Sequence, residues 1–97
     1  MEIHLTWDEG KRQRNLLKHG LDFADAGWVL ESLYRLDIES VHDDERRVLS
    51  ISYVMGVLAV LSVVHIAREG AARIISFRHA SREEREIYHA WLEEPDE

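Results

Sequence analysis

The feature that most constrains the fold is a long run of β-type sequence in residues 34–78. Apolar residues there alternate with polar ones or form short β-branched runs, and polar or glycine-containing breaks separate the runs. This spacing is typical of strands joined by tight turns, which form an antiparallel sheet. The expected strands are residues 35–39, 48–54, 57–66 and 73–78, with turns at 42–45, 55–56 and 68–70.

Helical signals stand on both sides of this run. Residues 3–6 read as a short first strand, after which Asp8 is placed to cap a helix over residues 9–18 and Gly20 to close it. Asp22 should cap a second helix that ends near residue 32. Ser81 and Glu84 form a capping box that opens a last helix ending near residue 93. The expected apolar face of the second helix is Phe23, Ala26, Val29, Leu30 and Leu33, and that of the last helix is Ile87, Tyr88, Ala90 and Trp91.

Together these signals predict an α+β domain. It comprises a short N-terminal strand, two helices, an antiparallel sheet of about four strands and a C-terminal helix. At 97 residues the chain suits one core, so we expect a single domain over residues 1–93, followed by an acidic tail at 94–97.

Composition narrows the class of protein. The chain has no cysteine, which excludes disulfides and thiolate metal sites and favours a reducing compartment, here the cytoplasm. The N-terminus lacks the basic start and apolar core of a signal peptide, and the longest apolar stretch, residues 54–67, is too short to span a bilayer. The consecutive turn residues 42–45 offer metal-ligand types but seldom converge on one ion, so we expect neither a metal site nor a cofactor.

Charge alone argues against general nucleic-acid binding, because the net charge is −7. The cations are nevertheless grouped. Lys11, Asn15 and Lys18 form one polar stripe on the first helix, and His19 follows at its end, where its near-neutral pKa suits an acid or a base. The structural alternative is a solvated helix face whose last turn carries cations that favour the helix dipole.

The strand at residues 73–78 is unusual because an arginine stands at each end. Strict alternation puts Ile74, Ser76 and Arg78 on one face and Arg73, Ile75 and Phe77 on the other. One interpretation has Arg78 and Arg68, across the turn, clamp a phosphate while His79 transfers a proton. The other has both strand-end arginines paired with carboxylates at the rim of the sheet. The three tryptophans fall on apolar faces and read as core.

The order of several short segments resembles the BrnT family of toxins. Each segment is weak alone, but together they follow that family's order from about Ile3 to Tyr88. They are Trp7-Asp8-Glu9, Lys11, Asn15, Lys18-His19-Gly20-Leu21-Asp22-Phe23, Ala26, Glu45-Arg46, Gly56, Arg68, Arg73-Ile74-Ile75-Ser76, Arg78, Ala80, Glu84-Arg85 and Tyr88. The chain departs from the family pattern at Phe77, where a small or polar residue is usual, and at His79, where an arginine is frequent.

This resemblance implies a RelE-like fold and a metal-independent endoribonuclease that inhibits translation when free. It implies a BrnA-type antitoxin partner, a ribbon-helix-helix protein through which the pair would contact DNA. For RNA cleavage by the adjacent 2′-hydroxyl, Arg68 and Arg78 are assigned to the phosphate, and Glu45 is a candidate base. His19 is assigned to activating the RNA as a further catalytic residue, and the residues assigned to binding the RNA are Lys11, Lys18, Arg73 and His79.

Two other functions fit the same sequence. One is a non-catalytic, degenerate toxin that only binds an antitoxin, and the other is a small-ligand binder on the same fold. Neither reading involves a membrane.

Overall fold

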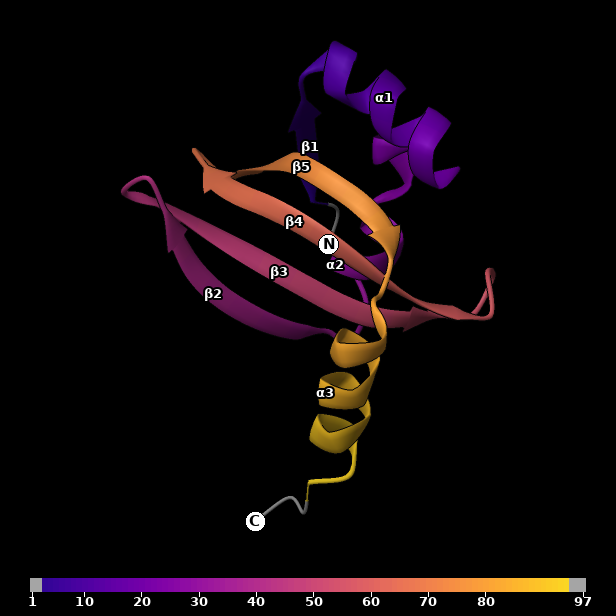
Figure 1. The fold of residues 1–97 in the computed structure, drawn as a ribbon. Helices are drawn as coiled ribbons and strands as arrows, with labels where there is room; N and C mark the ends of the chain where they lie inside the picture. The colour runs from indigo at the N-terminus through magenta and orange to yellow at the C-terminus, as the bar shows by residue number, and fades with distance from the viewer. Residues whose placement is uncertain (1–2, 95–97) are drawn as a thin grey trace.

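The structure is a computed structural model that describes residues 3–94, and Figure 1 shows its ribbon. Part of the expected acidic tail therefore lies outside the described residues, as do the first two residues of the expected domain. The elements in chain order are β1 (His4–Trp7), α1 (Glu9–His19), the 3₁₀ turn η1 (Phe23–Asp25), α2 (Gly27–Leu30), β2 (Leu36–His42), β3 (Glu45–Val54), β4 (Ala59–Arg68), β5 (Ala71–His79) and α3 (Arg82–Leu92). The predicted α+β class is confirmed.

The sheet has five strands in the order β1-β5-β4-β3-β2, rather than about four. Strands β2 to β5 form the predicted antiparallel run, joined by tight turns. The additional strand is β1, which pairs in parallel with the first half of β5, Thr6 standing opposite Arg73. A parallel neighbour needs a long crossover, and the chain from α1 through β4 supplies it.

The two faces of the sheet are covered unequally. Segments α1, η1 and α2 pack against one face and around the β1–β5 edge, while α3 covers only one end of the opposite face (Figure 1). The larger core lies on the first face, and its completely buried side chains are Phe23, Ala26, Val29, Leu61, Val63 and Phe77. The smaller core, beneath α3, comprises Ile51, Val60, Ala80 and Tyr88.

A β-bulge in β5 overturns the predicted assignment of its faces. Ser76 stands opposite Val64 and Ile74 opposite His65, so Ile75 has no partner in β4. The extra residue shifts the alternation by one position. Ile74 and Phe77 consequently enter the same core, and Arg78 faces the opposite side, toward α3.

The second predicted helix is shorter than expected. Asp22 caps η1 by accepting from the Ala24 N–H at 2.9 Å, and α2 then ends at Leu30. Because helical spacing stops there, Leu33 leaves the predicted apolar face and is 92% exposed. The other four residues of that face are buried, as predicted.

The caps of the other two helices follow the sequence signals. The Asp8 side chain accepts from the Lys11 N–H, and Gly20 closes α1 with a φ of 71°. Ser81 and Glu84 complete the capping box of α3. The predicted inner face of α3 is partly wrong: Tyr88 is buried and Trp91 half-buried, but Ile87 and Ala90 are exposed because α3 touches the sheet along a narrow stripe.

Within residues 3–94, none of the helices has the length and apolar character needed to cross a membrane.

Candidate functional site

A buried amide holds the end of α1 against the second half of β5. The Asn15 Nδ2 donates to the Phe77 carbonyl at 2.6 Å and to the Leu21 carbonyl at 3.0 Å, while its Oδ1 accepts from the Phe77 N–H at 3.2 Å. Strand β1 pairs only as far as Ile74, so Asn15 takes the place of a neighbouring strand beyond that point. The sequence showed Asn15 as part of a polar stripe but gave no sign of this role.

This junction brings four of the predicted site residues into one neighbourhood, which we call the helix-end cluster: Lys18, His19, Arg78 and His79. Burial lowers the pKa of His19, and the positive charges of Lys18, Arg78 and His79 lower it further. A lowered pKa keeps this imidazole neutral at pH 7, which is the form able to accept a proton. Phe77, next to Arg78, is completely buried and edge-on to Trp28, so this departure from the family pattern fills the core.

Arg78 is fixed by Glu84 of α3. Its Nη1 and Nη2 donate to the two carboxylate oxygens of Glu84 at 2.7 and 2.8 Å, and Nη1 also donates to the His79 carbonyl at 3.3 Å. Glu84 accepts from the Ser62 hydroxyl and the Ser81 N–H as well. These contacts, Arg78 foremost, lower the pKa of Glu84 to about 2. The capping box had identified Glu84 only as a helix start.

A second group of charged residues lies on the sheet face that α3 leaves uncovered. We call it the open-face cluster: Glu45, Arg47, Arg68 and Arg73. Arg68 Nη2 binds Glu45 Oε2 at 2.7 Å. Arg73 pairs with Ile66, and the β3–β4 register, carried one residue beyond Val48 and His65, puts Arg47 on the other side of Ile66. Arg47 was not among the predicted residues, because only the strand register reveals its neighbours.

The two clusters are well separated. Arg68 stands opposite Ala71 and Arg78 opposite Ser62, so the two positions are six residues apart along β4, roughly 20 Å. The prediction that both arginines bind one phosphate is therefore wrong. The turn that they were expected to flank lies at only one end of β5, and Arg78 is at the other end. Lys11 lies about two turns of α1 from Lys18, roughly 10 Å away.

A serine, a histidine and an aspartate also meet in the sheet. Ser50 Oγ donates to Asp37 Oδ1 at 2.6 Å and lies 2.8 Å from His65 Nε2. A nucleophilic serine would donate its hydrogen bond to the histidine, whereas this one donates its hydrogen bond to the carboxylate. Burial lowers the pKa of His65. We therefore read this group as a structural hydrogen-bond network, in which His65 Nδ1 is buried without a partner.

Across residues 3–94, no group of three or more histidine, aspartate or glutamate side chains is arranged to hold a metal ion.

Comparison with known proteins identifies a family. A family model described as "Ribonuclease toxin, BrnT, of type II toxin-antitoxin system" matches residues 7–84, from the end of β1 to the first turn of α3. None of the curated proteins compared with the chain matches it.

Proposed function

We propose that this chain, which belongs to the BrnT family of ribonuclease toxins of type II toxin–antitoxin systems, is a metal-independent endoribonuclease. It cleaves RNA in the cytoplasm and inhibits translation when free. A BrnA-type antitoxin with a ribbon-helix-helix domain neutralises it and provides the contact with DNA.

The observation that carries this proposal is the meeting of two imidazoles, a guanidinium and an ammonium in the helix-end cluster. Cleavage by the 2′-hydroxyl needs a base, an acid and positive charge beside the phosphate. Neutral His19 takes the proton of the 2′-hydroxyl as its oxygen attacks phosphorus. His79 gives a proton to the departing 5′-oxygen, and the products are a 2′,3′-cyclic phosphate and a 5′-hydroxyl.

Arg78 and Lys18 stabilise the charge that develops on the phosphoryl oxygens. Glu84 occupies part of the Arg78 guanidinium and fixes its plane, so the remaining N–H groups are held in one orientation. Asn15 fixes the position of the α1 end relative to His79 through its hydrogen bonds to the neighbouring Phe77. Glu84 and Asn15 are therefore positioning residues in this scheme.

The open-face cluster binds the RNA chain away from the reacting phosphate. Arg68 is roughly 20 Å from Arg78 along the sheet, so we assign it, with Arg47 and Arg73, to backbone phosphates. Glu45 orients Arg68 through their ion pair. Lys11 extends the cationic stripe of α1 beyond Lys18.

The test is RNA cleavage by the purified chain in the presence of a chelator, with the product ends identified. His19→Gln and His79→Asn should each lower the rate by about 100-fold or more, since general acid–base catalysis contributes that much. Arg46→Gln is the matched control, because Arg46 is exposed and pairs with Glu39 at the other end of the sheet.

Several results would contradict the proposal. Cleavage that requires added magnesium would refute metal independence. Full activity in both histidine variants, with loss in Glu45→Gln and Arg68→Gln, would move the proton transfer to the open-face cluster. Thermal unfolding of every variant separates loss of chemistry from loss of fold.

A second candidate function is a non-catalytic toxin that only binds an antitoxin. The Arg78–Glu84 ion pair favours it, because two carboxylate contacts neutralise the central guanidinium. Intact RNA at high concentrations of folded chain, together with antitoxin binding, would establish this alternative.

A further inference from the structure

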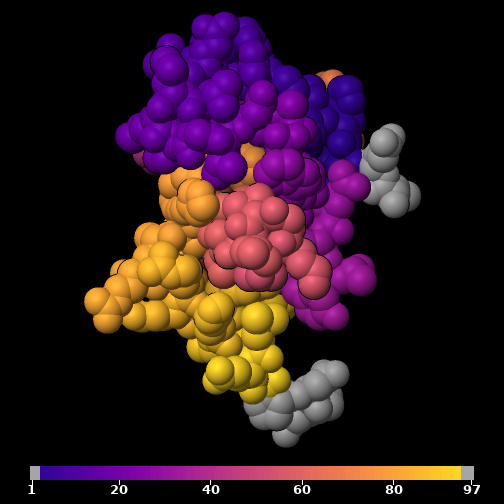
Figure 2. Space-filling model, turned by 90° about the vertical axis from the view of Figure 1, so that its right-hand side faces the viewer, coloured from indigo at the N-terminus to yellow at the C-terminus, as the bar shows by residue number. Residues whose placement is uncertain are grey.

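Exposed apolar side chains gather at one end of the molecule. Eleven large apolar side chains are exposed within residues 3–94, and six of them belong to the α2–β2 segment, the end of β3 and the β3–β4 loop. These six are Trp28, Leu33, Tyr34, Tyr53, Met55 and Leu58. In Figure 2 the loop stands in the centre of this face, with α1 above it and α3 below it. Clustering of this kind marks an interaction surface, unlike scattered apolar residues.

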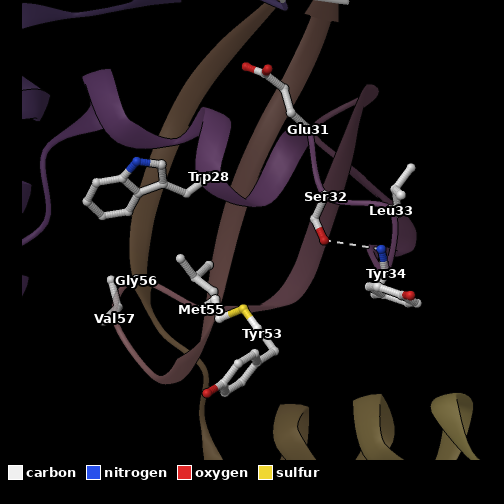
Figure 3. A pocket seen from close by; sticks show the side chains of 10 residues that line it. Trp28, Glu31, Ser32, Leu33, Tyr34, Tyr53, Met55, Gly56 and Val57 are labelled. Atoms are coloured by element: carbon white, nitrogen blue, oxygen red, sulfur yellow. Dashed lines mark hydrogen bonds between the residues drawn. The ribbon is translucent and has the colours of Figure 1, made fainter.

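A groove of about 650 Å³ runs through this patch. Trp28 stands on one side of it and Leu33 and Tyr34 on the other, with Met55 and Tyr53 between them (Figure 3). The Ser32 hydroxyl accepts from the Tyr34 N–H at 3.1 Å and fixes the turn that carries Leu33. Glu31 is the charged residue of the groove lining and lies at the end away from Tyr53.

Two leucines in this region are exposed in a way that the stability of the fold does not explain. Leu33 is 92% exposed, although the sequence gives it helical apolar spacing. Leu58 is 75% exposed and has a φ of 58°, in the left-handed region that a bulky side chain adopts at a cost. A strained backbone that keeps a leucine exposed to solvent indicates that the exposed side chain has a functional role.

The patch continues to the helix-end cluster. On the other side of the β3–β4 loop a second hollow shares Tyr53 with the groove and extends to His79, Arg85 and His89. The surface is thus acidic at the Glu31 end, apolar in the middle and basic at the His79 end. An elongated occupant with the opposite order of charges would fit both ends.

We propose that this groove and hollow form the docking surface for an amphipathic helix of the protein antitoxin. Apolar residues of that helix, three or four positions apart, contact Trp28, Leu33, Met55 and Leu58. A basic residue of the helix meets Glu31, and an acidic residue meets Arg85 and His79. The inference rests on the proposed function for its partner, and it explains neutralisation because the occupant covers His79 and excludes RNA.

The experiment measures the affinity of the purified cognate antitoxin, encoded with the toxin, for variants of the full chain. Leu33→Ser with Leu58→Asn should weaken binding by about tenfold or more, as expected when anchors of an interface are removed. Leu58→Asn also relieves the positive-φ strain, so the fold should be retained, and a melting temperature checks this. The control is Val41→Ser, which removes an apolar side chain that is 72% exposed in β2.

Antitoxin binding that is unchanged in the double variant, or weakened equally by Val41→Ser, would overturn the docking surface. A free chain that is a dimer, and that Leu33→Ser with Leu58→Asn converts to a monomer, would overturn it in favour of a second copy as occupant. The ribonuclease assay is separate: a chain that cuts no RNA but loses antitoxin affinity in the double variant retains the docking surface and refutes the enzymatic proposal.

Discussion

The two faces of the sheet are built differently, although the same strands form both. On the face toward α1 and α2, completely buried apolar side chains such as Phe23, Val63 and Phe77 form the larger core. On the other face, Tyr88 of α3 covers one end, and arginines occupy the uncovered remainder. The fold thus concentrates its hydrophobic stabilisation on one side, which leaves the other side free to carry charge.

The largest effect we expect is the loss of Phe77. Phe77→Ala removes a completely buried ring from the larger core and should lower the free energy of unfolding by about 3–5 kcal/mol. Trp91→Ala, on the half-covered face, should cost less than half as much because its ring is only half-buried. Urea unfolding of both variants makes the comparison, and equal costs would show that the two faces contribute equally.

The next effect concerns the charged end of the other face. Glu84→Gln breaks the ion pair with Arg78 and should lower the free energy of unfolding by about 2 kcal/mol at pH 7. The folded pKa of Glu84, about 2, lies below its ordinary value of 4.5. Its contribution is therefore complete above pH 4.5 and is lost as the pH falls toward 2. Stability of the variant, measured from pH 2 to 7, should lack this component, and an unchanged acid limb would contradict the assignment.

Arginines of the open face should hardly affect stability. Arg73→Gln should change the free energy of unfolding by about 0.5 kcal/mol or less, as is usual at half-exposed positions. If Arg73 contacts a phosphate, the salt dependence of RNA binding should weaken by about one unit of log–log slope. Arg82→Gln, at an exposed position on α3, is the matched control and should leave the slope unchanged.

The smallest effect is a shift in one pKa. Lys18→Met removes a positive charge beside His19, which favours the protonated imidazole and should raise the pKa of His19. Proton NMR titration of His19 measures the shift. A fall in the pKa would mean that Lys18 does not act on His19 through its charge.

Features with a local signal could be predicted from the sequence. Asp8, Gly20 and the Ser81–Glu84 capping box each act within a few residues, and the structure confirms them. Features that depend on distant partners could not be predicted. The parallel pairing of β1 and the reach of Asn15 to Phe77 join segments whose proximity no local pattern encodes.

The candidate site shows the same division. The residue types were found from the sequence, because a strand with arginines at its ends and a histidine at a helix end are visible there. Their grouping was not, since Arg68 and Arg78 are sorted into different clusters by strand register. Neighbours in the folded structure were needed to infer the roles of Glu84, Arg47 and the exposed leucines.

The unpaired Ile75 divides β5 into two half-strands that are out of phase by one residue. The first half pairs with β1, and the second half contacts α1 and α3, so one continuous strand has two sets of neighbours. Deleting Ile75 would remove the bulge and leave a regular ladder, in which Phe77 still faces the larger core and Arg78 still faces α3. The bulge is thus an inserted residue that the sheet absorbs without exchanging the hydrophobic and the charged side of the end of this strand.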